Sequence, residues 1–167
     1  MKSSITDLRK PVEIRQAAQQ ANTFFDNRLD CLINNAAATG AVGARDFAEL
    51  PLEEWNQSLE TNLTAPMLLS QLMLPALKNA RGSVIHISST RAHQSEPNSE
   101  PYAATKAGLL GLTHSMVCSQ LPKALTVASL QASLSKTVLS SFSCDPSHVP
   151  HFELPPLTLR STPLQTH

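Results

Sequence analysis

The sequence predicts an α/β fold in which a doubly wound parallel sheet carries helices between its strands. Apolar residues recur at the helical period in some segments and form short continuous runs in others, and the two kinds of segment alternate along the chain. Helices are expected at residues 11–27, 52–77 and 102–117, and strands at residues 29–33, 83–89 and 124–130. Strands that alternate with helices of this size pair in parallel through right-handed crossovers.

The first helix and the first strand follow from the residues within them. Pro11 suits the first turn of a helix, where its missing N–H is not needed, and apolar residues then recur at spacings of three and four from Ile14 to Phe25. Residues 29–33 form an apolar run broken only by Asp30, which is typical of a buried parallel strand. Two asparagines directly after this run end the strand.

The second helix carries an apolar stripe that extends from Leu52 to Met73. Pro66 lies inside this stripe, and a proline removes a backbone hydrogen bond there, so we expect a kink. The next strand has Val84 and Ile87 among its core residues, and the third helix is rich in alanine and leucine.

The ends of the chain differ in composition from its middle. All five glycines lie between Gly40 and Gly111, whereas a nucleotide-binding α/β fold needs glycine at its first strand–helix turn. We therefore expect an incomplete domain over residues 1–131 that lacks the first βαβ unit. Residues 132–167 are rich in serine and proline and show no helical or strand period, so we expect an irregular C-terminal tail.

Charge and hydropathy exclude several classes of protein. The formal net charge is zero, so we expect no nucleic-acid partner and no anionic membrane, because both need a basic patch. The sequence has no apolar run long enough to predict a spanning helix, and its three cysteines lack a CxxC pair, which is typical of reduced thiols in a cytoplasmic protein. His148 and His151 have the spacing of a metal pair, but the proline-rich tail offers no rigid frame, so no metal is expected.

The residues with the clearest chemistry are Tyr102 and Lys106, which lie four apart on the third predicted helix and so share one face. An ammonium beside a phenol favours the phenolate and lowers the tyrosine pKa from its ordinary value of about 10. A tyrosine tuned in this way exchanges a proton near neutral pH. Ser89 ends the preceding strand, at the sheet edge where ligands bind, and its hydroxyl can hydrogen-bond a substrate carbonyl there. By itself such a pair is more often a surface contact, so its meaning depends on the motifs around it.

Four linked motifs accompany this pair. They are Asn34-Asn35-Ala36-Ala37 after a strand, Trp55 and Asn62 in a long helix, Ile87-Ser88-Ser89 at a strand end, and Tyr102-Ala-Ala-Thr-Lys106-Ala-Gly108 at a helix start. In this order and at these intervals the chain resembles the short-chain dehydrogenase/reductase family over about residues 5–120. The resemblance implies a partial Rossmann-like fold.

The resemblance also implies a catalytic role for four residues. Tyr102 would be the general acid and base, and Lys106 would hold the nicotinamide ribose and lower the tyrosine pKa. Ser89 would orient the reacting carbonyl. Asn62 would shape the second helix and position a water molecule that relays protons to Lys106.

Cofactor contacts are implied for Tyr102 and Lys106, and for a further set of residues. The further set is Asp7, Asn34, Ala36 and Ala37. Asn34 would tie adjacent strands together, and the backbone at Ala36 and Ala37, where the family usually has Ala-Gly, would pass the cofactor ribose. Asp7 matches an aspartate that contacts adenine, and a plain turn or cap aspartate is the alternative.

The implied function is hydride transfer between NAD or NADP and a secondary alcohol or ketone. The sequence does not decide between the two cofactors, because the second strand that would read this choice is not seen and the Gly-rich turn that would bind the phosphates is absent. The loops at residues 38–50 and 90–101 would line part of the pocket for a small-molecule substrate. The family also implies a homo-oligomer through the helices at 52–77 and 102–117. The alternatives are a catalytically silent truncated member that acts only through dimerisation, and a truncated gene model.

Overall fold

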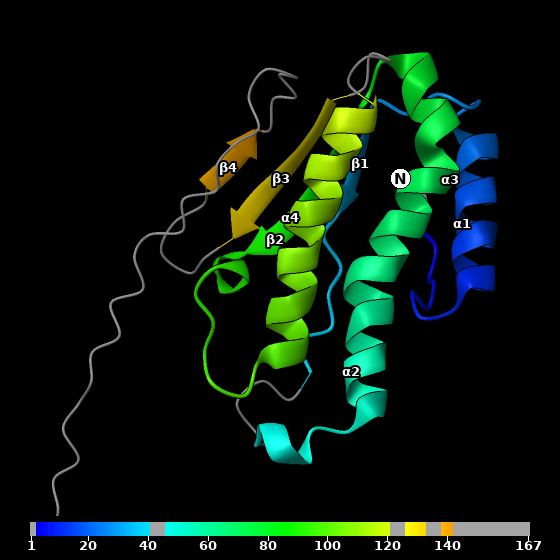
Figure 1. Cartoon of the computed structure of the whole chain (residues 1–167). Helices are drawn as coiled ribbons and strands as arrows, with labels where there is room; N and C mark the ends of the chain where they lie inside the picture. Colours follow the sequence, from blue (N-terminus) through cyan, green and yellow to red (C-terminus); the bar gives the residue numbers. More distant parts are fainter. Residues whose placement is uncertain (1–2, 41–45, 121–125, 133–137, 142–167) are drawn as a thin grey trace, which may run out of the picture.

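The computed structural model describes residues 3–40, 46–120, 126–132 and 138–141, which form a four-stranded sheet and its helices (Figure 1). In chain order the elements are α1 (Pro11–Phe24), β1 (Cys31–Asn34), η1 (Phe47–Glu49), α2 (Leu52–Leu59), η2 (Glu60–Thr64), α3 (Ala65–Ala80), β2 (Ser83–Ser89), η3 (Thr90–Ala92), α4 (Glu100–Gln120), β3 (Thr126–Ala132) and β4 (Val138–Ser141). Every predicted helix and strand is present, and the bounds differ from the predicted ones by a few residues at the ends.

The strands lie in the order β1-β2-β3-β4, and the first three are parallel. This confirms the α/β fold with a parallel sheet. In the register, His86 on β2 pairs with Asn34 on one side and with Ser129 on the other. The carboxyl ends of the parallel strands therefore meet at one edge of the sheet, where β2 ends at Ser89.

The strand β4 corrects one part of the sequence prediction. It lies within residues 132–167, which were expected to be irregular, and it pairs antiparallel with β3. A strand at the edge of a sheet presents unpaired backbone groups, and these accept a short neighbouring segment even where that segment has no period of its own. Residues 142–167 lie outside the described part of the chain.

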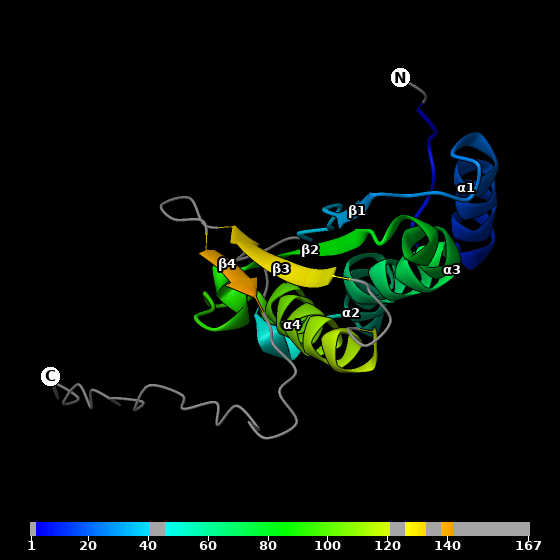
Figure 2. The ribbon, with the colours of Figure 1, turned by 90° about the horizontal axis from the view of Figure 1, so that it is seen from above.

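Helices α2, α3 and α4 gather on one face of the sheet, and α1 lies against α3 beyond the β1 edge, as the view from above shows (Figure 2). Val84 and Val127 on this face pack with Met73 and Leu77 of α3 and with Val117 of α4, and α1 joins this core through Ala18. The opposite face carries Ile33, which is 58% exposed, beside the half-buried Ile85 and Ile87. A doubly wound sheet has helices on both faces, and among the described residues only one face shows this layer.

The predicted second helix is two α-helices joined by a π-turn. The N–H of Ala65 bonds to the carbonyl of Glu60, five residues back, and Pro66 follows in the first turn of α3. Because Pro66 has no N–H, the carbonyl of Asn62 loses its usual α-helical donor, and the expected disturbance takes the form of a π-turn. Asn62 lies inside this turn and is fully buried.

A buried polar cluster links β1 and β2 to α3. The side-chain N–H of Asn34 donates to Ser70 Oγ at 3.2 Å and lies 3.3 Å from His86 Nδ1. His86 Nε2 and Ser129 Oγ, on neighbouring strands, have no partner among the described residues. Burial, together with the positive charge of Lys106, lowers the pKa of His86 to about 4. His86 is thus a buried core residue in contact with the Asn34 amide.

A glycine is required where α3 turns into β2. A Cβ on Gly82 would lie 2.9 Å from the carbonyl oxygen of Asp30 and closer still to that of Leu29. The Gly82 N–H bonds to the Leu77 carbonyl, and its own carbonyl accepts from Thr126, so this backbone has little freedom to move. In contrast, a Cβ on Gly111 of α4 would meet no described atom within 4 Å.

We therefore expect Gly82→Ala to lower the free energy of unfolding by about 1–3 kcal/mol, because the methyl group overpacks against fixed carbonyls. Gly111→Ala is the matched control and should raise it by about 1 kcal/mol, since alanine is the better helix former. Urea unfolding of both variants measures the difference. Equal effects of the two substitutions would contradict the close approach at Gly82.

His86 should make stability depend on pH. The folded protein holds the imidazole neutral down to a pKa of about 4, while the unfolded chain binds a proton from its ordinary pKa of 6.5. Stability is thus present above pH 6.5 and falls as the pH drops towards 4, by about 3 kcal/mol in all. His86→Gln should flatten this part of the curve in urea unfolding at a series of pH values. An unchanged slope in the variant would assign the loss to other groups.

Candidate active site

The site is organised by the first two turns of α4, which begins at Glu100. Tyr102 is half-buried, and Lys106 one turn later is 2% exposed. The Lys106 Nζ lies 5.5 Å from the centroid of the Tyr102 ring and donates a hydrogen bond to the Ile87 carbonyl at 2.7 Å. Burial lowers the pKa of Lys106 to about 8. The predicted pair therefore shares one face and is attached to the end of β2.

The two serines at the carboxyl end of β2 make different hydrogen bonds. Ser88 is buried, and its hydroxyl donates to the Lys106 carbonyl at 2.8 Å, which ties the strand to α4. The Ser89 hydroxyl accepts from the N–H of Arg91 at 3.2 Å and so caps η3. The contact expected of Ser89, a hydrogen bond to a substrate carbonyl, stays a prediction.

Arg91 lies between Ser89 and Tyr102: its backbone N–H bonds to the Ser89 hydroxyl, and its guanidinium lies over the Tyr102 ring. Its guanidinium carbon lies 5.7 Å from the centroid of the Tyr102 ring, and it pairs with Glu96 at 2.6 Å. The structure places this cation against the ring, where the face of the π-system attracts it.

Asn62 joins the loop after β1 to α4. Its Oδ1 accepts from the Ala38 N–H at 2.7 Å, and its Nδ2 donates to the Ala38 carbonyl at 2.8 Å and to Thr105 Oγ1 at 3.2 Å. Thr105 is fully buried and donates in turn to the Tyr102 carbonyl at 2.8 Å. Asn62 thus uses its amide on the chain itself, and the water relay expected of it stays a prediction.

Sequence reasoning missed Thr105. The one signal was a threonine inside a helix directly before Lys106, since such a hydroxyl commonly bonds back to a carbonyl three or four residues earlier. The contact to Asn62 could not be foreseen, because the two residues are 43 positions apart.

The residues expected to contact a cofactor fall into two places. Asn34 is buried at the end of β1, and Ala36 and Ala37 follow it with their side chains exposed, before the backbone is held at Ala38 by Asn62. The hydrogen bonds of Asn62 and Thr105 therefore link the segment that holds these residues to the first turns of α4, which carry Tyr102 and Lys106.

Asp7 lies elsewhere, in the turn before α1. Its carboxylate accepts from the Arg9 backbone N–H at 3.0 Å and from the Arg9 side chain at 3.1 and 3.0 Å. The hydrogen bonds from Arg9 lower the pKa of Asp7 to about 2. These contacts are those of a turn aspartate, and the contact with adenine that the resemblance implied stays a prediction.

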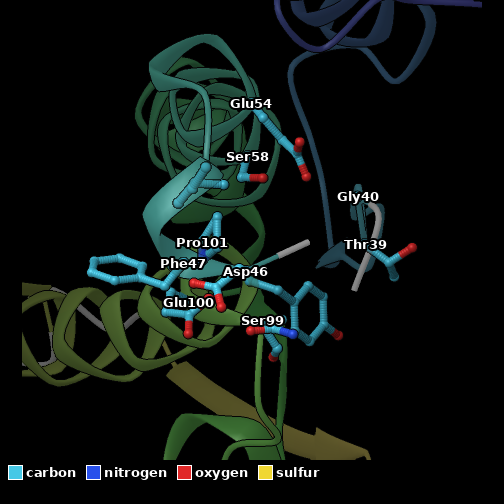
Figure 3. A pocket seen from close by; sticks show the side chains of 12 residues that line it. Thr39, Gly40, Asp46, Phe47, Glu54, Ser58, Ser99, Glu100 and Pro101 are labelled. Atoms are coloured by element: carbon cyan, nitrogen blue, oxygen red, sulfur yellow. The ribbon is translucent and has the colours of Figure 1, made fainter. Parts of the chain in front are cut away.

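A hollow opens beside Tyr102, and most of its lining comes from the two loops that the sequence assigned to a substrate pocket (Figure 3). It is lined by Thr39, Gly40, Asp46, Phe47, Leu50, Glu54, Ser58, Asn98, Ser99, Glu100, Pro101 and Tyr102. The contribution of Glu54 and Ser58 from α2 was not foreseen. Neither residue belongs to the four linked motifs, and the packing of α2 near α4 brings them to the hollow.

Among the described residues, no group of three or more histidine, cysteine, aspartate or glutamate side chains is placed to hold a metal ion. His148 and His151 lie outside the described ranges. In the same part of the chain, no helix has both the length and the apolar character needed to cross a bilayer. The oligomer expected through residues 52–77 and 102–117 stays a prediction.

Comparison with known proteins bears on this site. The model of the short chain dehydrogenase family matches residues 2–144. An uncharacterized oxidoreductase of Thermotoga maritima is 45% identical over 92 residues, which cover 54% of this chain and 35% of the relative.

Two solved structures show the same arrangement of elements. An oxidoreductase of Brucella ovis in complex with a partially ordered NAD has a TM-score of 0.71 and 28% identity, covering 75% of this chain and 60% of that one. A metagenomic short-chain oxidoreductase in complex with NADP has a TM-score of 0.73 and 27% identity, covering 80% and 60%. The chain thus covers between 35% and 60% of the length of these proteins. It belongs to the short-chain dehydrogenase/reductase family.

Proposed function

We propose that this chain carries the proton-transfer site of an NAD(P)-dependent oxidoreductase that interconverts a secondary alcohol and a ketone. The observation that carries the proposal is the Tyr102–Lys106 pair. The lysine ammonium lies 5.5 Å from the ring centroid, and its bond to the Ile87 carbonyl holds it at the end of β2. Family membership and the hollow beside Tyr102 support the same assignment.

The residues present fit the nicotinamide and ribose half of such a cofactor. A lysine ammonium has three N–H donors, and the hydrogen bond from Lys106 to the Ile87 carbonyl uses one of them. The other two can donate to ribose hydroxyls. The exposed positions Ala36 and Ala37 leave the backbone after β1 accessible. Two structural relatives hold NAD or NADP, and the cofactor, when bound, supplies the hydride.

Tyr102 acts as the general acid in ketone reduction. Its hydroxyl gives a proton to the carbonyl oxygen while the carbonyl carbon gains the hydride, and in alcohol oxidation the same oxygen takes the proton back. The positive charges of Lys106 and Arg91 near the ring stabilise the negative charge that forms on the tyrosine oxygen. Ser89 orients the substrate oxygen from the end of β2.

Asn62 and Thr105 are positioning residues in this proposal. They hold the loop at Ala38 and the first turn of α4 at a fixed separation through a chain of hydrogen bonds. The cofactor side and the proton donor are therefore aligned by the same buried amide. Because the cofactor side and the proton donor are already held in position, the reaction does not have to lose the entropy of aligning them in every turnover.

Tyr102→Phe tests the proposal. It removes the proton donor and keeps the ring, so we expect the rate of NAD(P)H-dependent ketone reduction to fall by about 10²–10⁴-fold. Binding of reduced nicotinamide mononucleotide, followed by NMR, should be retained in this variant and weakened in Lys106→Met. The mononucleotide is chosen because it carries the nicotinamide and ribose without adenosine. Turnover that is equal in wild type and Tyr102→Phe would overturn the assignment.

The protonation of Lys106 can be followed directly. Burial lowers its pKa to about 8, so the ammonium is present below pH 8 and is lost as the pH rises through that value. A 15N-lysine NMR titration should show one resonance with a midpoint near pH 8 that is missing in Lys106→Met. The rate of ketone reduction should fall over the same pH range. A midpoint at the ordinary lysine pKa of 10.5 would mean that the side chain is solvated.

A further inference from the structure

We propose that one water molecule is bound in the core between β2 and β3, where it accepts a hydrogen bond from the His86 imidazole and donates one to the Ser129 hydroxyl. This inference goes beyond the proposed function and does not depend on it, because it concerns the frame beneath the site. It rests on two buried polar atoms, on the pairing of the strands that carry them, and on the contact of His86 with Asn34.

Two side-chain atoms in this part of the core are buried without a hydrogen-bond partner. They are His86 Nε2 and Ser129 Oγ, and both residues are 0% exposed. Buried polar groups in folded proteins are nearly always paired, because an unpaired group keeps the full cost of leaving water. In the described part of the chain, the one other atom of this kind is Asn22 Oδ1 on α1. Two such atoms on neighbouring strands therefore indicate a shared partner.

The register of the sheet places the two residues side by side. His86 and Ser129 are Cα partners in the parallel pairing of β2 with β3, so their side chains project from the same face. The partners two positions earlier, Val84 and Val127, belong to the core that packs against α3 and α4. Because side chains alternate along a strand, His86 and Ser129 share that face, which α4 covers (Figure 2). The pair is thus enclosed between the sheet and α4.

The contact of His86 with Asn34 decides which ring nitrogen carries the proton. Asn34 Nδ2, which also donates to Ser70 Oγ, lies 3.3 Å from His86 Nδ1. An amide nitrogen only donates, so Nδ1 accepts. Burial lowers the pKa of His86 to about 4, and the neutral ring then carries its single proton on Nε2. The unpaired ring atom is therefore an N–H donor.

A water molecule satisfies both unpaired atoms at once. Its oxygen accepts from His86 Nε2, and one of its hydrogens is donated to Ser129 Oγ. Two hydrogen bonds of about 2.8 Å that meet at one oxygen span about 4.6 Å, and neighbouring strands lie about 4.8 Å apart. One water therefore has the reach to connect paired positions on the two strands. Buried waters in proteins commonly fill this role between polar groups that lack a direct partner.

The water completes a polar row that crosses the sheet. The row consists of Ser70 on α3, Asn34 on β1, His86 on β2 and Ser129 on β3. The residue after His86 is Ile87, whose carbonyl accepts the hydrogen bond from Lys106. The row therefore joins the three parallel strands directly beside the bond that holds the lysine of the candidate site.

A crystal structure of the full chain tests the proposal directly. We expect an ordered water within about 3.2 Å of both His86 Nε2 and Ser129 Oγ. Long-range ¹H–¹⁵N NMR of the imidazole, which needs no crystal, should show the ring proton on Nε2 at neutral pH. Both measurements use the unaltered chain, so they do not depend on whether a core variant folds.

A double-mutant cycle shows whether the two residues share a partner. Ser129→Ala should lower the folding equilibrium constant in urea unfolding, and this effect should be about fivefold smaller in a His86→Leu background, because the shared water is then already lost. Asn22→Ala is the matched control. Its unpaired oxygen lies on α1, which packs against α3, so its effect should be the same in both backgrounds.

The possible results separate clearly. An ordered water on both atoms, a proton on Nε2 and a coupled cycle would support the proposal. A ring proton on Nδ1, a direct hydrogen bond between the two side chains, a chloride ion in place of the water, or fully additive effects of Ser129→Ala and His86→Leu would overturn it. None of these readouts involves turnover, so the proposed redox function stands or falls separately.

Discussion

The attachment of α4 to the carboxyl end of β2 is the constraint on which the site depends. Lys106 donates from its ammonium to the Ile87 carbonyl, while its own carbonyl accepts from the Ser88 hydroxyl. These two hydrogen bonds, one from the side chain and one to the backbone of Lys106, fix the position of α4 relative to β2. Without them the buried ammonium would lose its acceptor, and an unpaired charge in a protein interior is strongly unfavourable.

A second link reaches the same helix from the other side. The π-turn between α2 and α3 turns Asn62 inward, and its amide binds the loop at Ala38 and Thr105 of α4. π-Turns are uncommon and occur often at functional sites, because they aim a side chain that a regular helix would direct elsewhere. Pro66 favours this irregularity locally, since it cannot supply the backbone donor that an α-helix needs. The turn that Pro66 favours therefore places Asn62 where its amide joins three segments: the turn itself, the loop at Ala38 and α4.

The motifs predicted where the candidate site residues lie better than they predicted the contacts of these residues. The four-residue spacing of Tyr102 and Lys106 follows from helical geometry, so the sequence was sufficient for their shared face. Ser89 lies at the strand end, as predicted, and its hydroxyl also caps η3. Asp7 matches a family position, and its carboxylate accepts hydrogen bonds from Arg9. The motifs did not reveal these local partners, and the contacts with substrate and adenine that the resemblance implied stay predictions.

By itself, the sequence determined the order of elements, the parallel sheet and the Tyr102–Lys106 face, because hydrophobic period and helical spacing are local properties. Only the tertiary structure decided how segments distant in the chain combine. The pairing of β4 with β3, the link from Asn62 to Thr105, and the meeting of Glu54 and Ser58 with Tyr102 in one hollow all join such segments. The physical reason is that packing and hydrogen-bond partners depend on which distant segments meet in the folded chain. The hydrophobic period of one segment carries no information about those partners.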